Sequence, residues 1–250
     1  VRAESRTPRR ICFRLQILNA REEFLIYNLK QIKMIFNMKA EENIEFPQRG
    51  DKFITDQNDS AKKKAWLNKS NTRFSNIANS YQIGALHLLN EAIRNDKQID
   101  SLIYPAFYTL RHYIELRMKE ILINIEFCLQ QNCELNLNEH PILPLWNKIV
   151  QLYGKLGEDN KTEEFRAMSE LMKELNSIDK NSIVFRYPHN VKGEKIQKVD
   201  YVDVENLKEV FLKCTYLLDG LGMQVAHYKG LTEDMLGEFY TSIRSSSSLT

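Results

Sequence analysis

The longest apolar pattern of helical period covers residues 101–129, where we expect one long helix. Two more apolar stripes run beside the main one, which is typical of a helix at the centre of a fold. The middle of this segment instead carries six polar or charged residues, Arg111, His112, Glu115, Arg117, Lys119 and Glu120. Burying charges without partners is costly. The middle is therefore either open to solvent or internally paired. The main stripe consists of Ile103, Phe107, Leu110, Ile114, Ile121, Ile125 and Cys128.

Four more helices are predicted by apolar periodicity: from about residue 62 or 72 to 95, from 144 to 156, from 161 to 176, and from 203 to 228. Asp100 or Ser101 is expected to cap the central helix and Asp203 the last one. Residues 182–188 favour an extended conformation, residues 192–194 a turn, and residues 196–202 a second strand. The predicted fold class is all-α, an up-and-down bundle of four to five helices with one small inserted β-hairpin. The stripe of the first helix consists of Phe74, Ile77, Tyr81, Leu88 and Ile93.

The pattern divides the chain into three parts. Residues 1–60 form an N-terminal extension expected to be poorly ordered, residues 61–235 form the bundle, and residues 236–250 form a mobile C-terminal tail with a serine run. The arginine-rich residues 1–37 resemble a transit peptide in composition. Alternatively they are a poorly ordered arm, or sequence upstream of a true start at Met38.

Composition and charge narrow the function classes. The 250 residues carry 35 basic and 33 acidic side chains, for a net charge of +2, so nothing global requires nucleic acid or an anionic membrane. An apolar run long enough to span a membrane is absent from the sequence. The four cysteines show neither a CxxC pair nor zinc spacing, which favours reduced thiols in the cytoplasm. We expect a soluble cytoplasmic protein without metal or cofactor and without membrane association.

The first candidate site lies in the polar middle of the central helix. Arg111, Glu115 and Lys119 are each four residues apart and share one face. They are either a neutralised ion pair inside the bundle or an anion site, in which Glu115 holds the guanidinium of Arg111 against a phosphate. His112 points about 100° away from Arg111. It is either a satisfied core residue or a catalyst.

The second candidate site lies between the fourth helix and the predicted hairpin. It comprises Asp179, Ser182, Arg186 and Tyr187. Asp179 and Ser182 could cap each other's backbone. If Arg186 turns inward, it joins Arg111, Glu115 and His140 in one polar pocket. Otherwise His140 is a turn residue before the proline-rich start of the third helix.

Several catalytic motifs are absent from the sequence: GxGxxG, the Walker loop, HExxH and GxSxG. Dinucleotide enzymes, P-loop NTPases, zincins and α/β-hydrolases are therefore disfavoured.

Three segments together, residues 110–120 (LRHYIELRMKE), 140–146 (HPILPLW) and 179–188 (DKNSIVFRYP), resemble a divergent bacterial branch of the HEPN superfamily, the higher eukaryotes and prokaryotes nucleotide-binding domains. The resemblance covers about residues 70–230 and implies an up-and-down helical bundle that is often dimeric. Many members are RNA-cleaving toxins or defence proteins, including those of toxin–antitoxin systems, and others bind nucleotides without catalysis. The ribonuclease branch uses an Arg followed four to six residues later by His. This chain lacks that spacing, and Arg186 and His189 are too close together.

Three functions follow as hypotheses. The leading one is an HEPN-like homodimeric module that binds RNA or a nucleotide, in a bacterial defence or toxin-like setting, through Arg111, Glu115, Lys119, His140, Asp179, Ser182, Arg186 and Tyr187. The second is a ribonuclease in which His112 acts as acid or base while Arg111 and Arg186 stabilise the phosphorane charge. The third is a structural dimerisation protein. Convergence of Arg111, Glu115 and Arg186 around an open pocket would favour the ligand site, and convergence in a sealed core would favour pairing.

Overall fold

The structure, a computed structural model, describes residues 47–53, 65, 74–131, 140–190, 192–197 and 199–247. The chain divides into two compact units, Val1–Ala65 and Trp66–Thr250. In the first unit, residues 47–53 form an irregular turn, in which the Asp51 amide donates to the Gln48 carbonyl at 3.1 Å. Gly50 sits in this turn with φ of 111°, a value that suits glycine.

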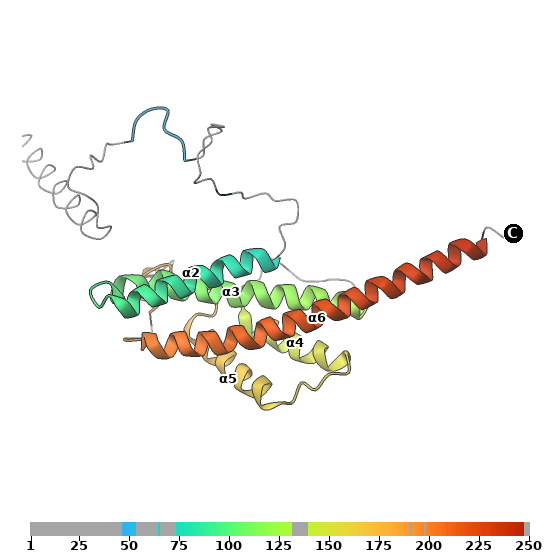
Figure 1. The fold of residues 1–250 in the computed structure, drawn as a ribbon. Helices are drawn as coiled ribbons and strands as arrows, with labels where there is room; N and C mark the ends of the chain where they lie inside the picture. The colour runs from blue at the N-terminus through green and yellow to red at the C-terminus, as the bar shows by residue number, and fades with distance from the viewer. Residues whose placement is uncertain are drawn as a thin grey trace, which may run out of the picture. The chain divides into compact units, whose positions relative to one another are not determined.

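The described part of the second unit is helical and contains no named strand (Figure 1). The all-α class is confirmed. Across the described ranges, no helix is both long and apolar enough to cross a membrane. The helices are α2 (Phe74–Arg94), α3 (Ile99–Cys128), α4 (Ile142–Lys155), α5 (Glu163–Ile178) and α6 (Val204–Ser247).

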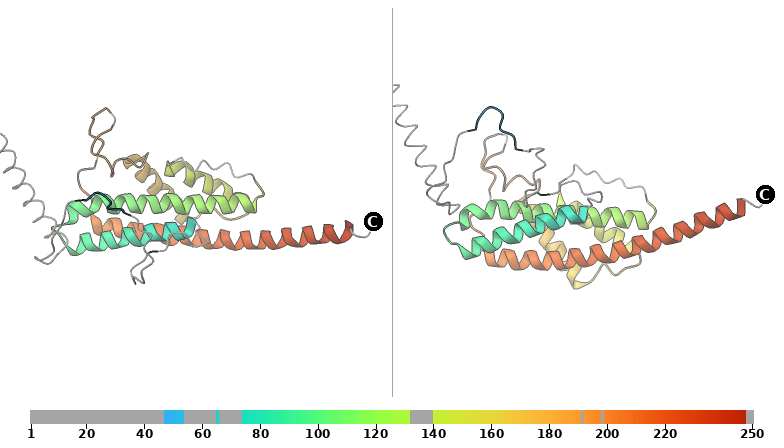
Figure 2. Two further views of the ribbon diagram at one scale, coloured as in Figure 1. Left: turned by 90° about the horizontal axis from the view of Figure 1, so that it is seen from above. Right: turned by 45° about the horizontal axis from the view of Figure 1, so that its top comes forward.

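Helix α3 occupies the middle of the unit and contacts α2, α4 and α6 (Figure 2). The predicted central helix is confirmed, but its expected cap is wrong. The N-cap is Gln98, without a side-chain hydrogen bond, because a tight turn from Asn95 to Gln98 starts the helix two residues early. Asp100 instead lies in the first helical turn, where a carboxylate interacts favourably with the helix dipole.

The buried face of α2 differs from the predicted stripe. Alanines at seven-residue spacing, Ala78, Ala85 and Ala92, are fully buried, whereas Ile77 is exposed. Small side chains let two helix backbones approach closely, so the larger apolar residues are displaced to the flanks of the contact. Tyr81 accordingly lies at the edge of the helix pair and is only half-buried.

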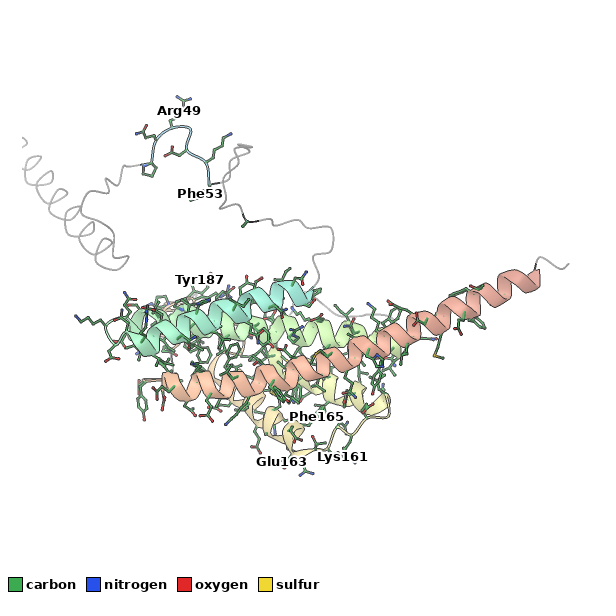
Figure 3. The ribbon with its side chains drawn as sticks, in the orientation of Figure 1. Arg49, Phe53, Lys161, Glu163, Phe165 and Tyr187 are labelled. Atoms are coloured by element: carbon green, nitrogen blue, oxygen red, sulfur yellow. The ribbon has the colours of Figure 1, made fainter. Side chains whose placement is uncertain are left out.

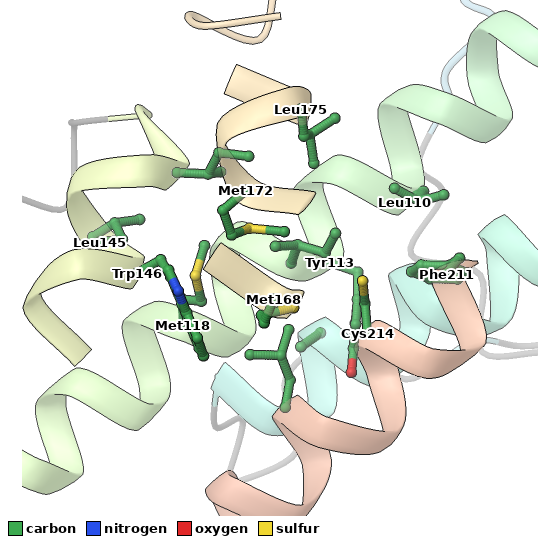
Figure 4. Close-up of a cluster of buried hydrophobic side chains, with 14 of the residues drawn as sticks. Leu110, Tyr113, Met118, Leu145, Trp146, Met168, Met172, Leu175, Phe211 and Cys214 are labelled. Carbon is green, nitrogen blue, oxygen red and sulfur yellow. The ribbon is translucent and has the colours of Figure 1, made fainter. Parts of the chain in front are cut away.

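The helices predicted at residues 144–156 and 161–176 are confirmed as α4 and α5, and their apolar faces meet α3 and α6 in one core (Figure 4). Trp146 lies at its centre, donates its indole N–H to Ser169 Oγ at 2.8 Å, and stacks on Phe165. A buried Trp whose N–H is satisfied contributes a large apolar area without stranding a polar group. The core residues of these two helices are Ile142, Leu145, Trp146, Ile149, Leu152, Tyr153, Phe165, Met168, Met172 and Leu175.

Residues 182–188, predicted to be a strand, form a tight turn instead. The Ile183 carbonyl accepts the amides of Arg186 and Tyr187 at 3.1 and 3.0 Å. Phe185 stacks on Phe107 of α3, with ring centroids 3.8 Å apart. These local hydrogen bonds and this burial override the β propensity of the segment. The turn at residues 192–194 is confirmed by the Gly193 amide bond to the Asn190 carbonyl.

The described residues of the predicted hairpin hold one isolated antiparallel bridge, between His189 and Lys195. A two-stranded hairpin therefore stays a prediction.

Helix α6 begins after Asp203, as predicted, and the Asp203 side chain accepts the Asn206 amide at 3.0 Å. Its expected end near Tyr228 is wrong, because the helix continues to Ser247 and projects past the other four helices (Figures 1 and 2). An i, i+4 pair between Lys229 and Glu233 supports the continuation. Residues assigned from the sequence to a C-terminal tail are thus helical up to Ser247.

Candidate functional site

Arg111 is the most buried charged residue of the described chain, at 0% exposure. Each guanidinium nitrogen donates at least one hydrogen bond. Nε reaches the Asp179 carbonyl at 3.2 Å, and one terminal nitrogen reaches Glu115 Oε2 at 3.1 Å. The other terminal nitrogen donates to the His140 carbonyl at 2.8 Å and to the Lys180 carbonyl at 3.4 Å. Arg111 therefore ties α3 both to the segment before α4 and to the loop after α5.

Glu115 is the acceptor at the centre of this cluster. Its other oxygen, Oε1, accepts from Lys119 Nζ at 2.9 Å and lies 3.0 Å from His140 Nδ1. Burial alone would raise the pKa of the Glu115 carboxyl, but hydrogen bonds from Lys119 and His140 and the charges of Lys119 and Arg111 outweigh it and lower that pKa. Glu115 is thus a carboxylate at neutral pH.

Asp179 joins the cluster to the loop that follows α5. Its Oδ2 lies 3.8 Å from Arg111 Nε, while its Oδ1 accepts the amides of Ile183 and Val184 at 2.8 and 3.2 Å. The Asp179 side chain therefore caps the amides of Ile183 and Val184, in place of the expected capping between Asp179 and Ser182. Ser182 itself is buried and has φ of 60°, a left-handed conformation that non-glycine residues seldom adopt.

The structure brings together Arg111, Glu115, Lys119, Asp179 and the half-exposed His140 in one hydrogen-bonded cluster. Arg186 does not join it, and neither does Tyr187: both are exposed on the outer side of the loop. The expected convergence of Arg111, Glu115 and Arg186 thus occurs only for the first two, in a closed setting. This arrangement favours the pairing alternative for Arg111.

Arg186 and Tyr187 line a separate pocket of about 490 Å³ beside the N-terminal part of α3, and Figure 3 shows Tyr187 at the surface. Arg186 Nε donates to the Ser182 carbonyl at 2.5 Å, and its guanidinium lies 5.5 Å from the ring centres of Tyr108 and Tyr187. His189 and Lys195 line the same pocket. A guanidinium held over aromatic rings, with two more basic groups nearby, is suited to binding phosphate.

His112 lies on neither the Arg111 cluster nor the pocket wall. Its ring meets Tyr81 edge to face at 4.5 Å and is parallel to Tyr108 at 6.0 Å. Burial lowers the pKa of His112, the Glu115 charge opposes this, and the charges of Lys119 and Arg111 add to the lowering. His112 is therefore a neutral aromatic ring at pH 7. Tyr108 separates it from Arg186, and Arg111 points into the core, so the three residues of the ribonuclease hypothesis do not share one cavity.

A second polar cluster, centred on Arg117, was not predicted from the sequence. Arg117 bonds Glu120 at 2.7 Å, Asn79 at 2.7 Å and Asp219 at 2.8 Å, and Tyr113 donates to Asp219 at 2.9 Å. Burial and the Asp219 charge raise the pKa of the Tyr113 hydroxyl. The local signals were the i, i+3 spacing of Arg117 and Glu120 and the i, i+4 spacing of Tyr113 and Arg117. The other partners come from α2 and α6 and are distant in sequence.

Comparisons with protein-family models, with curated protein sequences and with solved structures return no match to this chain. Membership of the HEPN superfamily therefore stays a prediction from the short segments quoted above.

Proposed function

We propose that this chain is an HEPN-like helical module that binds a phosphate-bearing ligand, a nucleotide or RNA, in the pocket lined by Arg186. The observation that carries the proposal is the joint presence of Arg186, His189 and Lys195 with the exposed rings of Tyr104 and Tyr187 around one cavity. Its volume of about 490 Å³ lies within the range of small-molecule sites. A cytoplasmic defence or toxin-like setting is supported by the resemblance alone.

In this proposal the buried cluster positions the pocket and does not touch the ligand. Arg111 and Asp179 fix the loop at the carbonyls and amides of residues 179–184, and Arg186 follows two residues later. Among the described residues that line the pocket, the only acidic side chain is that of Asp200. Arg186 and Lys195 against this one carboxylate leave the described lining of the pocket net positive.

Replacing Arg186 with Gln is expected to weaken binding of uridine and adenosine 5′-monophosphates by roughly 10- to 100-fold, because a charge-assisted hydrogen bond is lost. The melting temperature should stay within about 1–2 °C, since Arg186 is exposed. Isothermal titration and thermal melts on the same preparations measure both quantities. Binding should also weaken with added salt.

Arg166→Gln is the matched control, because Arg166 is an exposed arginine on α5 that pairs with Glu163 at 3.3 Å, away from the pocket lining. It should bind as the parent does. A parent protein that binds neither mononucleotides nor short RNA would refute the proposal, and so would equal binding by the Arg186 and Arg166 variants.

We propose further that the chain forms a homodimer through α6. In the projecting half of this helix, Leu231, Met235 and Ile243 are exposed and fall on one half of the helical circumference, together with half-buried Leu236. The acidic residues of the same stretch fall on the opposite half. Such an amphipathic helix is typical of a helix that packs against a partner. The resemblance to a family that is often dimeric and the exposed apolar face of α6 both favour a second copy as that partner.

Met235→Glu should convert the dimer to a monomer, because the carboxylate would have to be buried at the centre of the contact. Multi-angle light scattering across the micromolar range measures this. Met223→Glu is the control, since Met223 is as exposed as Met235, at 71% against 70%, but lies on the opposite half of α6. A monomeric parent across that range would contradict the homodimer.

A further inference from the structure

Next to the pocket, five planar side chains contact one another in series from α2 across α3 to the loop. Tyr81 of α2 meets the ring of His112 at 4.5 Å and 86°. His112 is parallel to Tyr108 within 6° at 6.0 Å, and the guanidinium of Arg186 lies 5.5 Å from both Tyr108 and Tyr187. We call these five residues, together with the exposed Tyr104 one turn before Tyr108 on α3, the aromatic ridge.

The ridge lies outside the buried core of α3. Tyr104, Tyr108 and His112 are spaced four residues apart and share one side of the helix, whereas their neighbours Phe107 and Arg111 are buried. The three α3 positions span about 12 Å along the helix axis. Tyr81, Tyr108 and His112 remain half-buried, and Tyr104 and Tyr187 are 47% and 55% exposed. The ridge is therefore accessible along its length.

We infer that the aromatic ridge binds successive bases of a single-stranded nucleic acid whose phosphates enter the pocket of Arg186, an inference that rests on the proposed function. Rings in series that are at least partly exposed offer stacking surfaces to any base. A length of about 12 Å exceeds what one base can cover, so a mononucleotide leaves most of the ridge unused. In a duplex the bases are already stacked and cannot reach these rings.

The pocket end of the ridge is lined by three basic side chains and by the carboxylate of Asp200, and the ridge residues themselves carry no carboxylate. Arg186, His189 and Lys195 face the phosphates, and the carboxylate of Glu115 beneath the ridge is buried and paired with Lys119 and Arg111. The lowered pKa of His112 keeps its ring neutral, so it acts here through stacking.

The test measures affinity against length with uridine 5′-monophosphate and the oligonucleotides rU2, rU4 and rU8. The tetramer should bind at least about 10-fold more tightly than the monophosphate, since each stacked base adds to affinity. Tyr81→Ala and His112→Ala should each weaken rU8 binding by about 5-fold or more and leave monophosphate binding unchanged. Tyr216→Ala, which removes an 86% exposed ring from α6, should change neither. Tyr81→Leu and His112→Leu keep the bulk of the side chain without its ring and decide the question if an alanine variant fails to fold.

Each outcome separates this inference from the proposed function. Equal affinity for the monophosphate and rU8 would contradict base binding by the ridge and would still agree with phosphate binding in the pocket. A protein that binds neither ligand would contradict both. Base binding by the ridge is also contradicted if affinity still rises with oligonucleotide length in the Tyr81 and His112 variants. The same holds if a 12-base-pair RNA duplex binds as tightly as rU8. dT8 identifies the sugar: tighter rU8 binding assigns RNA, and equal binding assigns single strands of either sugar, both in agreement with base stacking.

Discussion

Arg111→Gln should lower the free energy of unfolding by about 3–5 kcal/mol, the range measured when one partner of a buried ion pair is removed. Arg111 is fully buried and donates to Glu115 and to the carbonyls of Asp179, His140 and Lys180. A glutamine can replace only part of these bonds and carries no charge. For a unit of this size the melting temperature should fall by roughly 6–20 °C.

Chemical denaturation of the parent and of the Arg111→Gln, Glu115→Gln and Arg166→Gln proteins measures this effect. Arg166 is 68% exposed at its side chain, so its variant should stay within about 0.5 kcal/mol of the parent. The Arg111→Gln, Glu115→Gln double variant should lose less stability than the sum of the two single variants, because Arg111 and Glu115 are partners of one another. An unchanged stability of Arg111→Gln with lost nucleotide binding would instead make Arg111 a ligand residue.

The parts of the fold that the sequence predicted correctly are those in which one strong apolar stripe decides the burial. Phe165, Met168, Met172 and Leu175 recur at helical spacing and are all buried in α5. The polar middle of α3 was predicted to be either paired or open. The i, i+4 spacing of Arg111, Glu115 and Lys119 gave the intrahelical pairs correctly, because those contacts depend only on helix geometry.

The features that the sequence did not predict depend on partners distant in the chain. The buried face of α2 is set by how closely Ala78, Ala85 and Ala92 let α3 approach, and a stripe defined by large residues misses it. The turn at residues 182–188 depends on the Asp179 carboxylate, whose position is fixed by Arg111, 68 residues earlier. Propensity within a short window contains no information on that contact.

The Arg111 cluster links the core to the pocket through the loop after α5. A buried guanidinium holds the backbone of residues 179 and 180, and the Asp179 side chain holds the amides of residues 183 and 184. Phe185 then inserts beside Phe107 and leaves Arg186 on the surface. A site supported in this way keeps its geometry without a ligand, which reduces the entropy cost of binding.

Asp179→Ala should therefore impair stability and binding together. The substitution leaves the amides of Ile183 and Val184 without their acceptor and removes a carboxylate beside Arg111. Each unsatisfied buried group costs about 1–3 kcal/mol, so the free energy of unfolding should fall by roughly 3 kcal/mol or more. Because the loop that carries Arg186 loses its anchor, mononucleotide binding should weaken about as much as in Arg186→Gln, whose stability is unchanged.

Two further variants identify which property of Asp179 is responsible. Asp179→Asn keeps an oxygen acceptor for the two amides and loses only the charge, so it should be less destabilised and retain most of the binding. Asp159→Ala removes an aspartate that also accepts a loop amide, that of Lys161 at 2.8 Å, but at an exposed site, and should change neither quantity. An Asp179→Ala protein that is destabilised yet binds mononucleotides like the parent would show that the pocket does not depend on this anchor. Equal effects of Asp179→Ala and Asp179→Asn on binding would assign the coupling to the charge beside Arg111 and not to the capped amides.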